Sequence, residues 1–287
     1  MSYVLGVIGG SGLYRMEGLE SHEEIKITTP FGVPSDKIVR GKLGNTTMLF
    51  LPRHGRGHRI APSNINYRAN IHALKQLGAT HVVSVSAVGS LREEIEPRHL
   101  VIPSQFIDRT QRRDGTFFDA GIVVHVSMAD PVCPDLARAL TEAARSTGAT
   151  VHTDKTYVCI EGPRFSTRAE SHAFRAMGAD IIGMTNVPEA FLAREARLPY
   201  ATLALSTDYD CWRPHDEVEV QQILAIVHDN VARAQQALQT LAASLPDPST
   251  SPARKALDGA ILTRLDEILH SDKERYLTLL GDKLPWP

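Results

Sequence analysis

The sequence is poor in cysteine, in aromatic residues and in uncompensated charge. Its 287 residues include 3 cysteines, 6% aromatic residues and a formal net charge of -2. The cysteines, Cys133, Cys159 and Cys211, are odd in number and far apart. This pattern disfavours a disulfide framework and fits a reducing compartment. The small negative charge disfavours a general nucleic-acid binder, which usually carries a basic face.

Long hydrophobic runs are also missing. No apolar stretch is long enough to span a bilayer. The first residues show neither the basic segment nor the small-residue cleavage site of a secretory signal. We therefore expect a cytoplasmic protein with no membrane partner. With 43% hydrophobic residues, the chain can build one large α/β domain or two small ones.

Short apolar runs alternate with segments of helical periodicity, which predicts an α/β fold. Strands are expected over residues 3–8, 47–51, 81–86, 100–103, 156–160, 180–184 and 200–206. Helices are expected over residues 66–77, 134–147 and 216–243, with one more between Thr167 and Gly178 and another starting at Pro188. Thr167 and Glu170 have the spacing of a capping box.

The composition changes near residue 245. We expect one domain over residues 1–245, a linker rich in proline and serine over 246–254, and a C-terminal amphipathic helix with its tail over 255–287. The helix rests on apolar residues at helical spacing, which are Leu257, Ile261, Leu265, Ile268 and Leu269. It either packs on its own domain or reaches a neighbouring subunit.

Two early segments are candidates for binding an anion. The segment Gly9-Gly10-Ser11-Gly12 follows the first strand, so its amides and hydroxyl can face an anion. It lacks the dinucleotide fingerprint and the P-loop lysine, and a tight turn explains it equally simply. The segment 51–59 holds the densest positive cluster, with Arg53 and His54 suited to phosphate oxygens.

A metal site at His54 and His58 must be weighed because the two histidines are four residues apart. Gly55 and Gly57 lie between and beside them, which disfavours the helix that would bring both rings to one ion. No glutamate occupies the position that a zinc protease requires. The sequence therefore predicts no metal.

Three further segments join strands to loops or helices. Residues 85–90 combine small side chains with glycine, which is typical of ligand crevices at strand ends and also of close strand–helix packing. Residues 159–167 and 183–189 have equally ordinary explanations. Phe165 and Met184 suit a core, Ser166 suits a helix cap, and Glu189 suits the first turn of a helix.

Two carboxylates, Asp208 and Asp210, follow the apolar run 201–206. Carboxylates where a buried strand ends are costly unless something pairs with them. The 6-amino group and N7 of adenine would be suitable partners. An anion site and a carboxylate pair together indicate phosphate and a purine nucleoside as ligands.

These segments together resemble a known family. The chain is similar to the S-methyl-5′-thioadenosine phosphorylase family of the trimeric purine nucleoside phosphorylase superfamily. The resemblance covers about residues 3 to 245. Its motifs, in order, are Gly9–Leu13, Arg53–Arg56, Asn66–Asn70, Gly89–Arg92, Glu161–Phe165, Met184-Thr185, Pro188-Glu189 and Thr207–Trp212. It implies a single α/β domain with a central mixed, partly barrel-like β-sheet flanked by helices.

The resemblance also implies roles for individual residues. Phosphate-binding positions match Ser11, Arg53, His54, Ser86, Ala87 and Thr185. Positions that hold the base and the ribose match Phe165, Met184, Asp208 and Asp210. Ser166 and Val220 match positions that set specificity, and His125 is similar to a histidine that reaches the pocket of the adjoining subunit. Asn186 departs from the family, in which many members have threonine.

The implied activity is reversible phosphorolysis of S-methyl-5′-thioadenosine, with Asp208 as the catalytic acid that protonates or hydrogen-bonds N7. It implies no cofactor, inorganic phosphate as co-substrate and a homotrimer, with no nucleic-acid partner. A phosphorylase acting on 6-oxopurine nucleosides or on methylthioinosine is the nearest alternative. Two further alternatives for this chain belong to other functional classes: a nucleoside hydrolase and a non-catalytic nucleotide-binding module.

Overall fold

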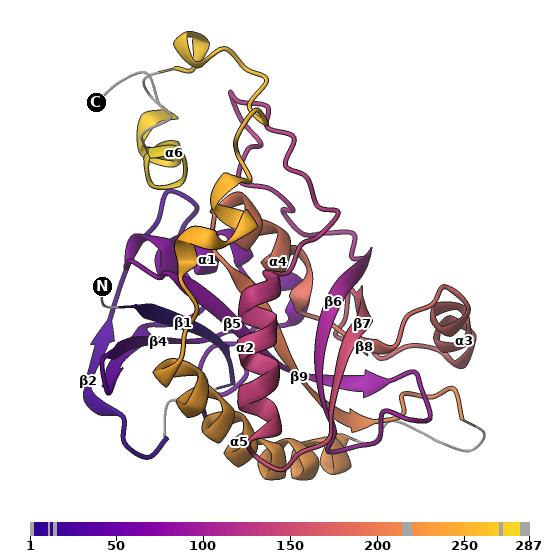
Figure 1. Ribbon diagram of the computed structural model, residues 1–287. Coiled ribbons are helices and arrows are strands. Elements are labelled where there is room, and N and C mark those ends of the chain that lie inside the picture. The colour runs from indigo at the N-terminus through magenta and orange to yellow at the C-terminus, as the bar shows by residue number, and fades with distance from the viewer. Residues whose placement is uncertain (1–2, 11, 14–15, 214–219, 270–271, 282–287) are drawn as a thin grey trace.

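The computed structural model describes residues 3–10, 12–13, 16–213, 220–269 and 272–281. A mixed sheet of nine strands forms its centre, in the order β2-β3-β4-β1-β5-β8-β7-β6-β9 (Figure 1). The strands are β1 (Val4–Gly9), β2 (Glu20–Ile25), β3 (Ile38–Leu43), β4 (Thr46–Pro52), β5 (His81–Ser90), β6 (Leu100–Arg109), β7 (Val151–Ile160), β8 (Ile181–Gly183) and β9 (Tyr200–Asp208).

Part of this sheet closes on itself. Strand β5 pairs with β9 as well as with β1 and β8, so β5, β8, β7, β6 and β9 form a ring of five strands. The β5–β8 and β6–β9 pairs are antiparallel, whereas β7–β8, β6–β7 and β5–β9 are parallel. This confirms the expected mixed, partly barrel-like sheet in a single α/β domain.

Helices cover both faces of the sheet. They are α1 (Tyr67–Gln76), α2 (Pro134–Arg145), α3 (Arg168–Ala176), α4 (Asn186–Glu195), α5 (Val220–Ala243) and α6 (Lys273–Leu280). One hydrophobic core lies between the sheet and the buried faces of α2 and α5, and a second lies between the sheet and α1, α4 and α6. These two layers hold the strands at fixed positions and so define where the strand ends meet.

Several helix ends follow from local sequence. The Thr167 side chain accepts a hydrogen bond from the Glu170 amide, and the Glu170 carboxylate accepts one from the Thr167 amide, which confirms the predicted capping box. Asn66 caps α1 by accepting from the Ala69 amide. Beyond α1, Gly78 adopts a left-handed φ of 84°, which ends the helix as the sequence predicts.

The C-terminal part of the chain corrects the sequence analysis. A continuous amphipathic helix was expected over the apolar residues 257–269, but they form turns, an isolated bridge between Ile261 and Val124, and the 3-10 helix Leu265–Glu267. The only α-helix among the described residues beyond 245 is α6. The helical spacing of these apolar residues does not reflect a helix, because Leu257 and Ile268 are buried individually, in the core shared with α1 and α4.

The expected linker also has structure of its own. It contains the 3-10 helices Pro248–Thr250 and Pro252–Lys255. Ser251 between them is buried, and its hydroxyl lies 3.3 Å from the Cys133 thiol at the start of α2. The described tail thus packs on its own chain.

An arm extends away from the sheet beside the tail (Figure 1). We define it as residues 110–126, which follow β6, together with residues 256–264. The two segments of the arm are joined by hydrogen bonds from the His125 amide to the Ala260 carbonyl and from the Leu262 amide to the Val123 carbonyl, both 2.9 Å.

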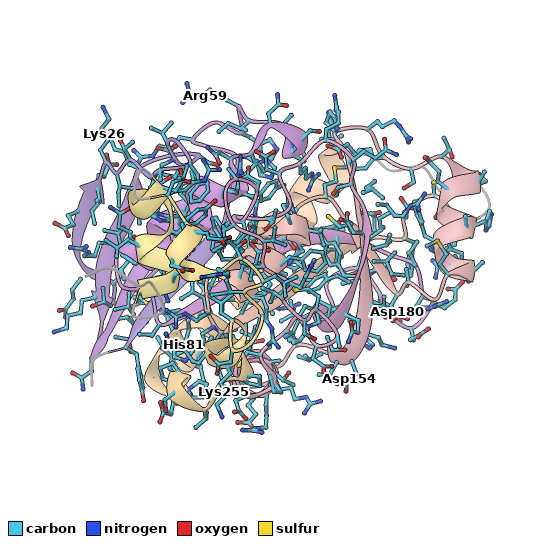
Figure 2. All side chains as sticks on the ribbon, turned by 90° about the horizontal axis from the view of Figure 1, so that it is seen from above. Lys26, Arg59, His81, Asp154, Asp180 and Lys255 are labelled. Carbon is cyan, nitrogen blue, oxygen red and sulfur yellow. The ribbon has the colours of Figure 1, made fainter. Side chains whose placement is uncertain are left out.

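Viewed from above, charged side chains such as Lys26, Arg59 and Asp154 lie on the outside of the molecule (Figure 2).

The carboxyl ends of four strands meet at one edge of the sheet. Gly9 of β1 lies beside Pro52 of β4, and Gly89 of β5 lies beside Asp208 of β9, all in parallel register. In α/β sheets this edge is where ligands bind.

Among the residues described, no helix has the length and apolar character needed to cross a membrane.

Candidate functional site

A cavity of about 400 Å³ opens at this edge of the sheet. It brings together segments from both halves of the chain. Of the residues that the sequence analysis proposed for the site, it is lined by Arg53, His54, Ser86, Ala87, Phe165, Ser166, Met184, Thr185, Asp208, Asp210 and Val220. The early basic loop and the late carboxylates therefore face one hollow, as the sequence analysis required.

Arg53 lies at the end of β4 and is only 2% exposed. Its Nε and Nη2 donate to the Glu189 carboxylate at 2.8 and 3.0 Å, and Nη2 also donates to the Ser84 hydroxyl at 2.6 Å. Nη1 has one long bond, 3.3 Å to the Val85 carbonyl, so it has a hydrogen left for a ligand. Burial alone would lower the pKa of Arg53, but the Glu189 carboxylate outweighs it and raises the pKa.

Glu189 lies in the first turn of α4, as expected from the sequence. The sequence did not reveal that it is fully buried and forms an ion pair with Arg53. Tyr200 of β9 donates its hydroxyl to the same carboxylate at 3.0 Å. The fixed orientation of Arg53 thus depends on residues far away in sequence.

Asn186 extends this buried network towards the cavity. It is fully buried at the start of α4, and its amide nitrogen donates to the Tyr200 hydroxyl at 2.9 Å. Its amide oxygen accepts the Ser86 hydroxyl at 3.1 Å. A chain of hydrogen bonds therefore connects Ser86, which lines the cavity, to Glu189 and Arg53.

His54 directly follows Arg53 and also lines the cavity. Its Nδ1 lies 2.8 Å from the carbonyl of Ile60, and its ring stacks on that of His58 with centroids 4.2 Å apart. Burial, followed by the nearby Arg53, lowers the pKa of His54 to about 4, against the Ile60 hydrogen bond, which raises it. The ring is accordingly neutral near neutral pH.

The other end of the cavity carries the two late carboxylates. Asp208 ends β9, where its Oδ1 accepts the Asp210 amide at 2.7 Å and its Oδ2 accepts the Thr207 hydroxyl at 2.6 Å. Burial raises the pKa of Asp208 despite these two bonds, and the Asp210 carboxylate adds a smaller rise. Burial also raises the pKa of Asp210.

Gly89 allows the two carboxylates to approach the sheet. A Cβ atom on Gly89 would lie 3.1 Å from Oδ1 of Asp208 and 3.0 Å from the Ile182 side chain. Both distances are tighter than ordinary contacts, so any larger residue would displace Asp208. Asp210 itself adopts a left-handed φ of 52°, which aspartate tolerates better than most residues.

Groups around the carboxylates are open to a flat ligand. Phe165 is 40% exposed although it lines the cavity. The buried hydroxyl of Ser166 has no hydrogen-bond partner among the described residues. An exposed ring, an unpaired hydroxyl and a carboxylate with a raised pKa are suited to a heterocyclic base that offers both donors and acceptors.

The comparisons with known proteins agree with this arrangement. Residues 4–244 match the model of the family described as the phosphorylase superfamily. The chain belongs to the phosphorylase superfamily. It is 53% identical to an S-methyl-5′-thioadenosine phosphorylase of Geobacter sulfurreducens over 283 residues, covering 98% of this chain and 99% of the relative.

Solved phosphorylase structures share the fold closely. A methylthioadenosine phosphorylase from an antarctic soil metagenomic library superposes with a TM-score of 0.92 at 49% identity, covering 98% of this chain and 100% of the other. The methylthioadenosine phosphorylase of Schistosoma mansoni, solved in complex with adenine, gives a TM-score of 0.85 at 37% identity, with 90% and 99% covered.

Of the described residues that the phosphorylase resemblance singled out, His125 does not line this cavity. His125 lies on the arm, where its amide bonds to the Ala260 carbonyl. Ser11 lies outside the described residues, although its neighbours Gly10 and Gly12 line the cavity. Within the described ranges, no group of three or more His, Cys, Asp or Glu side chains could hold a metal ion.

Proposed function

We propose that this phosphorylase catalyses the reversible phosphorolysis of S-methyl-5′-thioadenosine to adenine and 5-methylthioribose 1-phosphate. The observation that carries the proposal is the cavity, in which Arg53 and His54 face the same hollow as Asp208 and Asp210. Relatives that are about 50% identical to this chain in sequence are named for this activity. The proposed reaction needs inorganic phosphate as co-substrate and no cofactor.

The anion end would hold phosphate below the ribose. Arg53 has Nη1 to offer, and the Thr185 hydroxyl makes no cap bond to α4 and lines the cavity. Ser86 and Ala87 of β5 and the glycine loop that includes Ser11 would complete the cradle. A positioned phosphate oxygen then attacks C1′ without the entropy loss of a free encounter.

The base end would stabilise the leaving group. The bond from C1′ to N9 breaks as the bond from the phosphate oxygen to C1′ forms, and the electron pair passes into the purine. Asp208, with its raised pKa, donates a proton or a hydrogen bond to N7. Asp210 and Ser166 would accept from or donate to the remaining polar edge of adenine, with Phe165 stacked on its face.

The ribose and its 5′ substituent would lie between these ends. Met184 lines the cavity next to Thr185 and provides an apolar surface for the sugar. Val220, at the start of α5, is exposed at the cavity and would contact the methylthio group. We propose that His125 of an adjoining subunit closes this region in a homotrimer, since the arm places it away from its own cavity.

The remaining proposals concern the organisation and location of the chain. We propose that residues 1–245 form the phosphorylase domain and that the segment beyond it completes the arm through residues 256–264. The three cysteines are free thiols buried in the protein, which suits a reducing compartment such as the cytoplasm.

A substrate panel tests the proposed function directly. Release of free base would be followed from S-methyl-5′-thioadenosine, methylthioinosine, adenosine and inosine, each with and without phosphate. We expect adenine to be released from the methylthio substrate only when phosphate is present. Equal release in phosphate-free buffer would identify a hydrolase, and preferential release of hypoxanthine would identify a 6-oxopurine phosphorylase.

A further inference from the structure

The hydrogen bond of the His54 ring fixes which nitrogen carries the proton. Nδ1 lies 2.8 Å from the Ile60 carbonyl. A carbonyl oxygen only accepts, so Nδ1 must be the donor. The loop maintains this arrangement, because the amides of Arg59 and Ile60 both donate back to the His54 carbonyl, at 3.0 and 3.1 Å. In the neutral ring, Nε2 therefore presents a lone pair.

A lone pair is the wrong group for an anion. Sulfate and the deprotonated oxygens of phosphate need hydrogen-bond donors, and a neutral His54 with Nδ1 occupied offers them none at Nε2. The sequence analysis assigned His54 to the phosphate site as a donor. It can act as one only when Nε2 also carries a proton and the ring is an imidazolium.

The cations close to His54 are already paired with carboxylates. Two cations face the ring, Arg53 and Arg113, together with the stacked His58. Arg53 is paired with Glu189, and the Arg113 Nε lies 3.7 Å from the Glu161 carboxylate. Each of the two buried cations therefore has a carboxylate close to it, and Glu161 also lies 4.0 Å from Arg112.

The hydroxyl of Ser86, which lines the cavity, is also engaged. It donates to the Asn186 amide oxygen, so its hydrogen is engaged inside the protein. Among the described side chains at this end, an entering dianion meets one spare hydrogen of Arg53, the Thr185 hydroxyl, a neutral imidazole and an engaged serine. Additional positive charge can come from a proton, and His54, whose Nδ1 is fixed by Ile60, is placed to take it, with His58 as the other histidine of the cavity.

We propose that anion binding at this site is coupled to the uptake of one proton by His54, which becomes an imidazolium and donates Nε2–H to the anion. This inference rests on the proposed function, which places phosphate at Arg53 and His54. The proton comes from solvent, and no bond to carbon or phosphorus changes. The Ile60 carbonyl stabilises the imidazolium by continuing to accept from Nδ1.

The coupling has a definite sign with pH. The low pKa of free His54, about 4, means that the ring is neutral before the anion enters. The anion favours the protonated ring, so binding weakens as pH rises from the free to the bound pKa. Affinity for an anion of constant charge should fall about tenfold per pH unit in this range.

Calorimetry with sulfate tests the coupling, because sulfate keeps both charges across the neutral range. Binding heats would be measured at about pH 6, well above the pKa of about 4 of the free ring, in buffers of different ionisation enthalpy. The dependence of heat on buffer enthalpy gives the protons exchanged. We expect uptake of about one proton per site in the unchanged protein.

Matched variants locate the proton. His54→Gln retains an amide donor near the position of Nε2 but cannot titrate, so we expect sulfate to bind without proton uptake. His58→Gln alters the stacked neighbour and should leave the uptake in place. Loss of uptake in His58→Gln, with uptake retained in His54→Gln, would overturn the assignment.

A second measurement needs no variant. Nitrogen NMR shifts of the histidine rings distinguish the neutral ring from the imidazolium, and sulfate should convert the His54 signal to the imidazolium form at neutral pH. Sulfate binding with no proton uptake and a neutral His54 would overturn this inference alone. Failure of both sulfate and phosphate to bind would instead overturn the proposed phosphate site, and this inference with it.

Discussion

The two ends of the cavity differ in how their polar groups are hydrogen-bonded within the protein. At the anion end, the polar groups already have partners within the protein, since Arg53 is paired with Glu189 and Ser86 donates to Asn186. At the base end, the Ser166 hydroxyl has no partner among the described residues, and burial keeps the Asp208 pKa high. The anion end is held rigid by a network behind it, whereas the base end has a buried hydroxyl, that of Ser166, available to a ligand.

This difference shows how one cavity can bind two chemically distinct ligands, an anion and a purine. A rigid cradle positions a small symmetric anion and needs little from its neighbours beyond the correct charge. A purine has a specific pattern of donors and acceptors, so the groups that recognise it must remain unpaired until it binds. Mutations at the two ends should accordingly fail in different ways.

The largest expected effect concerns the choice of base. A carboxylate at the base end accepts from the 6-amino group of adenine but faces a lone pair on a 6-oxopurine. Sites built on hydrogen bonds discriminate against such mismatches by about 10⁴–10⁵-fold. We expect kcat/KM for S-methyl-5′-thioadenosine to exceed that for methylthioinosine on this scale. Comparable values for the two substrates would show that the base end is not selective.

The next effect is on turnover. Asp208→Asn keeps the shape of the side chain but removes the proton donor for N7, so we expect kcat to fall by about 10²–10⁴-fold. Asp154→Asn, at an exposed position of β7, provides the control and should retain full activity. Steady-state kinetics at saturating phosphate measure both variants. Unchanged turnover in Asp208→Asn would remove Asp208 from the mechanism.

A large loss of stability is expected at the anion end. Glu189→Gln leaves the Arg53 charge buried and uncompensated, which typically costs about 3–5 kcal/mol of unfolding free energy. Asp229→Asn breaks an exposed pair with Arg98 at 3.3 Å and should cost about 0–1 kcal/mol. Urea denaturation compares the two variants. Similar small losses in both would mean that the buried pair does not fix Arg53.

The pH profile separates the two ends further. The raised pKa of Asp208 means that its carboxyl stays protonated to higher pH than an ordinary aspartate. As pH rises through this pKa the proton donor is lost, and kcat at saturating phosphate should fall about tenfold per pH unit. Asp208→Asn should abolish this limb while leaving anion binding sensitive to pH. A limb that persists in the variant would belong to another group.

The smallest effect concerns Asn186. Asn186→Leu removes the partner of the Ser86 hydroxyl and of the Tyr200 hydroxyl, so we expect a loss of about 1–3 kcal/mol in unfolding free energy and a higher KM for phosphate. Asn186→Thr, which restores a hydroxyl, should show less of both losses. Wild-type stability and phosphate KM in Asn186→Leu would contradict the proposed link between the network and the cradle.

Local patterns in the sequence predict much of the fold. The capping box of Thr167 and Glu170 and the glycine after α1 are confirmed because they depend on a few adjacent residues. Strands β2 and β3 were missed. In β2 the charged residues of an edge strand hide its alternation, and in β3 Gly41 and two basic residues interrupt the apolar pattern.

Long-range partners could not be read from the sequence. Glu189 is separated from Arg53 by 136 residues, and nothing in its immediate surroundings distinguishes a buried ion pair from a helix-dipole carboxylate. The apolar spacing at 257–269 fitted a helix, but Ile261 instead pairs with Val124 on the arm. In both cases a contact made by folding decides the role of the residue.

The most direct test is a crystal structure of the protein with phosphate and adenine. We expect the anion at Arg53, His54 and Thr185 and the base at Asp208 and Phe165, with N7 within hydrogen-bond distance of the Asp208 carboxyl and room for one ribose between them. Binding of either ligand outside this cavity, or of both at the same end of it, would show that the two ends do not hold phosphate and purine on either side of a ribose.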